Sequence, residues 1–209
     1  MFSSIQKFAI LVVPVLSAIT FHEVAHGYVA YLFGDPTAKQ AGRLTLNPIK
    51  HIDPIGMIAL FLVKVGWAKP VPVNPLFFSH KRAGLFFVSL AGPAVNFALA
   101  VVFALIFHGI LGAKPFSYYY AHPIIKPILF MCEAGVLINI GFGVFNLLPI
   151  PPLDGSNILI SILPEDMARI FAKIGKFGFL ILIILFFTGV VQKALLPLIY
   201  KIASILLPI

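Results

Sequence analysis

Two histidines and a glutamate stand together at His22, Glu23 and His26, in the order H-E-x-x-H. On a helix the two histidines lie one turn apart, about 6 Å along the axis, so both imidazoles can bind one metal ion. Zinc suits such a pair, and Glu23 would place a carboxylate where a hydrolase needs a general base for water. The pattern therefore indicates metal-dependent hydrolysis of the kind that metalloproteases perform.

The surroundings of this motif favour a metal site. Apart from the motif itself, the only charged residue between Ile5 and Phe33 is Lys7. Ionisable groups inside an apolar membrane segment are costly, and they are functional by default. The alternative is that the histidines hydrogen-bond to neighbouring helices and bind no metal.

A catalytic zinc ion usually has three protein ligands, so the motif needs a third partner. The metzincin pattern is excluded, because its third histidine would stand at the position of Leu32. Asp154 is the best-placed acid, since the break NLLPIPPLDGSN after an apolar stretch can turn its carboxylate back toward the membrane. Gly155 would allow close approach of the backbone. A helix-capping aspartate in an Asp-Gly turn is the alternative.

The chain that positions these groups has the composition of a membrane protein. Of its 209 residues, 60% are hydrophobic and 11% are charged, and the mean hydropathy is +1.04. At about 20 residues a span, four to six crossings fit, with no separate soluble domain. We therefore expect an all-α polytopic membrane protein in which residues 1–209 form one integral-membrane domain.

The net charge of +8 does not indicate a nucleic-acid partner, because the basic residues are scattered through short segments with no stripe of interleaved aromatics. The single cysteine, Cys132, excludes both a disulfide framework and a cysteine zinc cluster. We interpret Cys132 as a small buried hydrophobic residue and the charges as signals of membrane topology.

Four apolar stretches are predicted to cross the bilayer, at about residues 5–33, 84–111, 124–148 and 177–191. A last apolar piece, 194–209, either crosses or lies flat, and the segment 157–163 is too short to cross and ends at Pro164. After the first span, the alternation at Arg43–Leu46 predicts a short strand or β-hairpin. Residues 55–65 are half a span long and predict a re-entrant or shallow helix.

The distribution of lysine and arginine predicts the orientation, on the assumption that residues 52–66 do not cross the bilayer. Residues 34–83 hold seven of them, and Arg169, Lys173 and Lys176 add three in what the sequence predicts to be a loop on the same side. Because basic residues concentrate in cytoplasmic segments, the amino terminus is predicted outside. The two histidines then lie in the cytoplasmic half of their span, level with Asp154.

Four motifs occur in order along residues 20–160: FHEVAHGYVAYLFGDPTAKQAGRLTLNP, WAKPVPVNP, AGPAVNF and NLLPIPPLDG. Together they resemble the site-2 protease family of intramembrane zinc metalloproteases, and more narrowly its compact members, which lack PDZ and CBS domains. The resemblance implies that His22, His26 and Asp154 bind Zn²⁺ and that Glu23 activates the attacking water.

The resemblance also implies roles for three further residues. Asn146 would hold the substrate or its developing oxyanion, and Gly92 and Asn96 would lie beside the active site as substrate-contact candidates. The residues themselves leave these roles open. An amide in an apolar run must find hydrogen-bond partners, so Asn146 could equally bond to another helix. A glycine and an asparagine four residues apart also suit close helix packing.

The implied activity is regulated intramembrane proteolysis: hydrolysis of peptide bonds within or near transmembrane segments of membrane proteins, by a multi-pass cell-membrane enzyme whose site faces the cytoplasm. An extended substrate could add to the edge of Arg43–Leu46. A membrane metal transporter is one alternative, but it would need ligands along both halves of a path. A noncatalytic scaffold is another, and it would not need Glu23. Nothing in the loops selects one substrate or an oligomeric state.

Overall fold

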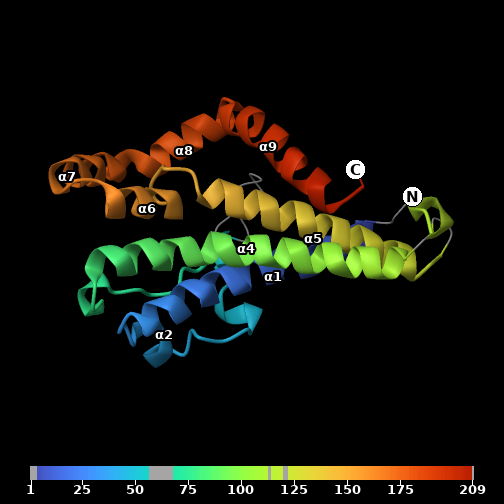
Figure 1. Ribbon diagram of the computed structural model, residues 1–209, viewed down its shortest axis with the longest axis horizontal. Coiled ribbons are helices and arrows are strands. Elements are labelled where there is room, and N and C mark those ends of the chain that lie inside the picture. Colours follow the sequence, from blue (N-terminus) through green and yellow to red (C-terminus); the bar gives the residue numbers. More distant parts are fainter. Residues whose placement is uncertain (1–3, 57–67, 113, 120–121, 209) are drawn as a thin grey trace.

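The computed structural model describes residues 4–56, 68–112, 114–119 and 122–208, and within them every regular element is helical (Figure 1). Three long helices pack against one another: α1 (Ser4–Leu32), α4 (Lys81–Leu111) and α5 (Ile125–Asn146). Each is long and apolar enough to cross a membrane, and the helical run Glu165–Phe187 is a fourth candidate span. The predicted all-α membrane fold is therefore confirmed.

The carboxyl-terminal third continues as a series of shorter helices, which form an arch beside α5 in Figure 1. They are α6 (Asp154–Ile162), α7 (Glu165–Ile174), η4 (Gly175–Phe177), α8 (Gly178–Phe187) and α9 (Val190–Leu206). As predicted, α6 is short and ends before Pro164. The fourth span begins earlier than the predicted residue 177, because α7, η4 and α8 follow one another without a break. Arg169, Lys173 and Lys176 consequently lie on helical turns and not in a loop.

Among the described residues, the short helices between the long ones include α2 (Thr37–Gln40), η1 (Pro48–Lys50), η2 (Pro75–Phe77) and η3 (Phe116–Tyr119). The prediction of a strand at Arg43–Leu46 is wrong, because these residues form an irregular loop. The Thr45 carbonyl, within this loop, accepts a hydrogen bond of 2.8 Å from the His51 ring, and the Arg43 side chain donates to the Lys69 carbonyl at 2.8 Å.

The re-entrant or shallow helix predicted for residues 55–65 falls mainly on 57–67, which lie outside the described residues. On either side of that segment, Ile52 and Ala68 form an isolated antiparallel bridge. The hydrogen bond from the Lys69 amide to the His51 carbonyl, 3.0 Å long, supports it. The bridge brings the chain after the segment back to the chain before it, beside α1.

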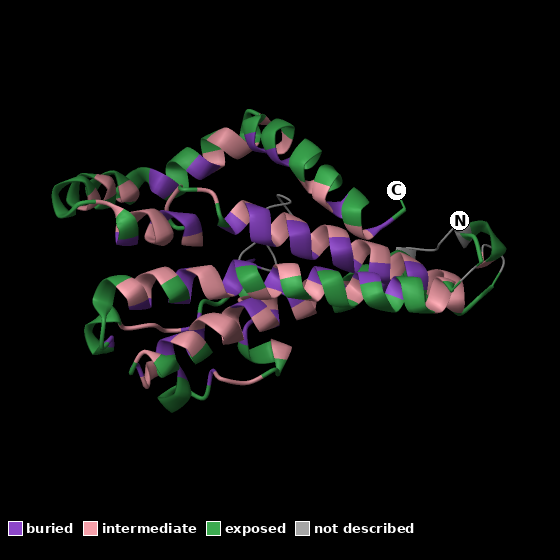
Figure 2. Cartoon of the chain, in the orientation of Figure 1, coloured by how far each residue is buried: buried purple, intermediate pink, exposed green. Residues whose placement is uncertain are grey.

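The main core lies between α4, α5 and α9, where Ala100 and Ala104 face Leu129, Val136 and other apolar side chains. Cys132 is buried there as a small apolar residue, in line with the sequence interpretation. Buried residues follow the inner faces of α4 and α5, whereas α7 and α8 are mostly exposed (Figure 2). Large apolar side chains exposed along α7 and α8 fit a surface that faces lipid.

Candidate metal centre

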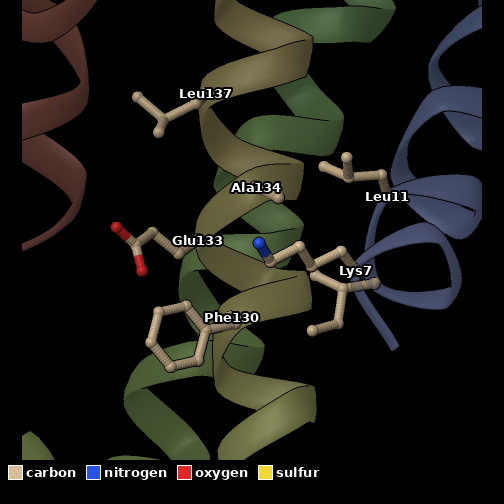
Figure 3. Close-up of a pocket in the computed structure, with 7 residues that line it drawn as sticks. Lys7, Leu11, Phe130, Glu133, Ala134 and Leu137 are labelled. Carbon is tan, nitrogen blue, oxygen red and sulfur yellow. The ribbon is translucent and has the colours of Figure 1, made fainter. Parts of the chain in front are cut away.

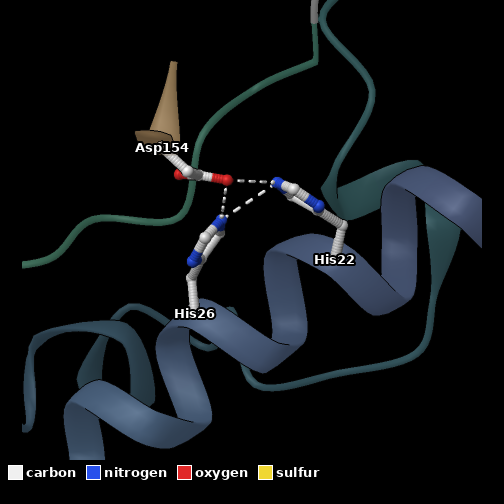
Figure 4. Close-up of side chains that lie close together, drawn as sticks. All are labelled: His22, His26 and Asp154. Carbon is white, nitrogen blue, oxygen red and sulfur yellow. Dashed lines mark hydrogen bonds and ion pairs between the residues drawn. The ribbon is translucent and has the colours of Figure 1, made fainter. Parts of the chain in front are cut away.

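Three side chains from distant parts of the chain meet beside α1. His22 Nε2 and His26 Nε2 lie 3.0 Å apart, and Asp154 Oδ2 lies 3.2 Å from the first and 3.3 Å from the second. Figure 4 shows the two rings and the carboxylate pointing to one common position. Their side chains are 5%, 12% and 15% exposed, so bulk water is largely excluded from this position.

The hydrogen bonds behind the two rings determine which nitrogen atoms carry protons. His26 Nδ1 lies 2.7 Å from the Val88 carbonyl oxygen, which can only accept, so Nδ1 is the donor. His22 Nδ1 lies 2.7 Å from Asn96 Oδ1. A neutral imidazole that donates through Nδ1 leaves a lone pair on Nε2. Both Nε2 atoms therefore present lone pairs to the centre.

Asn96 cannot be flipped, because its neighbours fix the orientation of its amide. Asn96 Nδ2 donates to the Ala18 carbonyl at 3.1 Å and to Asn139 Oδ1 at 3.0 Å. Asn139 in turn donates to the Gly135 carbonyl at 2.8 Å. Asn96 and Asn139 are fully buried, so every polar atom in this chain of contacts needs its partner. The chain runs from α5 through α4 to His22 and holds that ring in one tautomer.

This geometry fits a zinc ion. Two neutral imidazoles and a carboxylate would direct lone pairs at one another across 3.0–3.3 Å, and a cation between them relieves that repulsion. Donors placed about 2.0–2.1 Å from a tetrahedral zinc are about 3.3–3.4 Å from one another. Among the described residues, His22, His26 and Asp154 are the one group of three that could hold a metal ion.

Two glycines allow the ligands to come together. A Cβ on Gly92 of α4 would lie 2.5 Å from His22 Cε1 and 2.5 Å from His26 Nε2, so only glycine leaves room for both rings. A Cβ on Gly155 would collide with the backbone carbonyl of Leu147, because the start of α6 folds back on the end of α5. The close approach expected of Gly155 is thus present. It is Leu153, and not Asp154, that occupies the helix-capping position, without a side-chain bond.

Two acidic side chains hold the loop 68–74 beside α1. Glu23 Oε2 accepts a hydrogen bond of 2.7 Å from the Val71 amide. Asp35, just after α1, accepts one of 2.6 Å from the Asn74 amide and others from the Thr37 amide and hydroxyl. Burial alone would raise the pKa of Asp35, but these hydrogen bonds from Thr37 and Asn74 lower it below its ordinary value. The loop therefore lies along the helix that carries both histidines.

Asn146 is the last residue of α5, and its amide donates to the Phe142 carbonyl of the same helix at 2.9 Å. Phe142 packs its ring edge against His22, with ring centroids 4.8 Å apart. Asn146 thus lies one helical turn from a residue that touches a candidate ligand. The contacts described for Asn146 do not include the three donor atoms themselves.

Groups around the site that the sequence argument missed include the Val88 carbonyl, the Val71 amide and Asn139. Asn139 had a detectable signal, because an asparagine in an apolar membrane stretch needs buried partners. The two backbone groups had none, because every residue type carries them.

A second pair of ionisable residues lies elsewhere on α1 and α5, at Lys7 and Glu133. They line a pocket of about 310 Å³ with Ile10, Leu11 and Phe130. In Figure 3 the Lys7 amine and the Glu133 carboxylate lie on different sides of α5. Lys7 is 15 residues before His22, or about 22 Å along a helix, so this pocket is separate from the metal centre. A lysine among the lining residues also disfavours a cation there.

Comparisons with known proteins point to zinc metalloproteases. The profile of Peptidase family M50 matches residues 113–189. YwhC of Bacillus subtilis (strain 168) is 38% identical over 189 residues, covering 90% of this chain and 84% of that protein. Rip2 of Mycolicibacterium smegmatis is 31% identical over 205 residues, covering 95% and 74%. Both names describe candidate zinc metalloproteases. No solved structure gives a significant match.

The apolar helices and these relatives define a zinc metalloprotease that is a multi-pass membrane protein, with Zn²⁺ as its cofactor. The chain belongs to peptidase family M50, the site-2 proteases. The resemblance drawn from the four sequence motifs is thus confirmed.

Proposed function

We propose that this protein hydrolyses peptide bonds within or near the transmembrane segments of other membrane proteins, with His22, His26 and Asp154 as its zinc ligands. One observation carries the proposal: the three donor atoms lie 3.0–3.3 Å apart, two of them on a helix apolar enough to span a membrane and the third on the short helix that follows another such span. A substrate that reaches this centre must itself enter the bilayer region, and a membrane-spanning segment does so.

Glu23 is the proposed general base. When bound, zinc polarises the peptide carbonyl and makes the attacking water more acidic. Glu23 takes the proton of that water and passes it to the leaving amine. The hydrogen bond from the Val71 amide engages one carboxylate oxygen, so the orientation of Glu23 depends on the loop 68–74.

Asn146 and Asn96 take different proposed roles. Asn146 would turn its amide from the Phe142 carbonyl to the substrate or to the developing oxyanion, at the exit of α5. Asn96 is fully buried behind His22, so it would act on the ring and not on the substrate. Gly92 would serve by leaving space for both histidines, next to the position of the scissile bond.

The proposed orientation places the active site toward the cytoplasm and the amino terminus outside. Seven basic residues between 34 and 83 support it: five stand in the sequence between α1 and α4, and Lys81 and Arg82 begin α4, at the end of that span nearer in sequence to α1. Water needed for hydrolysis would then enter from the cytoplasm. Labelling of single cysteines introduced at Lys39 and Lys114, in sealed vesicles, tests this orientation.

The function is tested with purified protein in liposomes and a single-span model substrate. Wild type should bind one zinc ion and cleave, Glu23→Gln should keep the zinc and lose cleavage, and Asp154→Ala should lose both. Zinc-loaded wild type that cleaves no membrane segment would refute the proposed substrate class. A transporter or a scaffold, in contrast, would keep its activity in Glu23→Gln.

A further inference from the structure

A cationic pocket lies at the junction of α4, α6 and α7, apart from the metal centre. Its volume is about 440 Å³. Its charged lining is formed by Lys81 and Arg82 at the start of α4 and by Glu165 and Arg169 on α7, and Leu85 and Ile160 contribute apolar walls. Asp154 stands at the opposite end of α6 from this pocket.

The charges around the pocket do not balance. Arg169 Nη2 lies 3.5 Å from Glu165 Oε2, a long contact between side chains that are 71% and 75% exposed, and such a pair contributes little. Lys81 and Arg82 are exposed, and both line the same pocket. With three cations and one carboxylate, the lining carries a net charge of two positive units.

Each of the two helices that supply these charges begins a candidate membrane span. The span of α4 starts at Lys81, and the fourth candidate span starts at Glu165. The α7 residues that line the pocket share one face of that helix, at positions 165, 168, 169 and 172. Met167, Ile170 and Ile174 are exposed on the remaining surface of α7. Helix α7 therefore presents one face to the pocket, and its exposed apolar residues suit contact with lipid.

We propose that this pocket binds the phosphate of an anionic phospholipid. The guanidinium groups of Arg82 and Arg169 can form paired hydrogen bonds with phosphate oxygens, and Lys81 adds a third cation. Leu85 and Ile160 offer apolar surface to the glycerol and first methylene groups. A lipid is the occupant because the pocket lies at the headgroup level, where basic pockets between spans hold anionic lipids. The bound lipid would fasten α4 to α7, next to the helix that carries Asp154.

The test uses the full chain in nanodiscs of equimolar phosphatidylcholine and phosphatidylglycerol. After extraction into mild detergent, native mass spectrometry counts the lipids that each protein retains. Wild type should retain phosphatidylglycerol in preference to phosphatidylcholine. Lys81→Gln with Arg82→Gln should lower that preference on the order of tenfold. The matched control is Lys193→Gln with Lys201→Gln on α9, which loses equal charge outside the pocket and should change nothing.

Glu165→Gln changes the charge of the pocket in the opposite direction, because it removes the one carboxylate of the lining. Retention of phosphatidylglycerol should therefore rise. Zinc content, measured on every variant, confirms folding because no variant touches the metal centre. Equal retention by wild type and the α4 double variant would overturn the proposal, as would an equal loss in the α9 control. Displacement of the lipid by millimolar inorganic phosphate would also overturn it, since the pocket would then be a general anion site.

Discussion

His22 and Asn96 form a buried hydrogen bond of 2.7 Å in which the ring donates and the amide oxygen accepts. The direction is fixed because the Asn96 amide nitrogen faces the Ala18 carbonyl, an obligate acceptor. The Nε2 lone pair of His22 is thereby aimed at Asp154, which lies 3.2 Å away. Asn96 lies behind the ring and not among the three donor atoms, but it thus determines whether His22 is ready to bind a metal ion.

Asn96→Ala should weaken zinc binding about 10–100-fold, the usual cost of losing a partner behind a metal-bound histidine. The variant frees His22 to rotate and leaves Asn139 without its donor. Competition with a fluorescent chelator measures the zinc dissociation constant. Equal zinc affinities for wild type and Asn96→Ala would contradict the role assigned to Asn96.

Gly92→Ala should abolish stoichiometric zinc binding. Its new methyl group would lie 2.5 Å from atoms of both His22 and His26, so at least one ring must move. Gly109→Ala is the matched control, because it makes the same change on the same helix where no atom lies within 4 Å. Metal analysis by mass spectrometry measures the zinc content of both variants, and melting curves verify that both are folded. Normal zinc content in Gly92→Ala would show that the rings tolerate displacement.

Glu23→Gln should lower the cleavage rate about 10²–10⁴-fold while zinc content stays unchanged. Glutamine retains an acceptor for the Val71 amide, so the loop 68–74 stays in place and only the proton acceptor is lost. Single-turnover cleavage of a fluorescent single-span substrate gives the rate. If the rate stayed within twofold of wild type, another group would have to serve as the base.

Asp35 should make stability depend on pH. Because its folded-state pKa is lowered, its contribution is present above the unfolded value of about 3.9 and is lost as the pH falls through the folded value. Asp35→Asn should therefore melt at a lower temperature than wild type at neutral pH, and the difference should shrink below about pH 4. Asp166→Asn, at an exposed position on α7, is the control and should melt like wild type at every pH.

The parts of the site that depend on local spacing could be predicted from the sequence. His22 and His26 face one way because helix geometry alone puts them there. Asp154 could be found because a proline-rich break after an apolar stretch returns the chain to the membrane, and Gly155 indicated how closely it would return. The long apolar spans followed from composition in the same way.

The parts that depend on helix packing could not be predicted. The bond between His22 and Asn96 joins residues 74 positions apart, and that between Asn96 and Asn139 joins residues 43 apart. Their register is set by how α1, α4 and α5 pack. The prediction of a strand at Arg43–Leu46 was wrong for a related reason: a short alternating pattern does not reveal that the Thr45 carbonyl bonds to the His51 side chain and not to a neighbouring strand.

The position of Asp154 in the chain has a consequence for biosynthesis. His22 and His26 enter the membrane with the first span, whereas Asp154 follows two further spans, 128 residues after His26. A nascent chain therefore carries the two histidines long before it can offer the third donor. If all three are needed to retain zinc, the ribosome must complete α5 and α6 before peptide hydrolysis can begin. Newly inserted chains would then leave the translocon as inactive precursors. They would not cleave the unfolded membrane segments of other proteins that are present there.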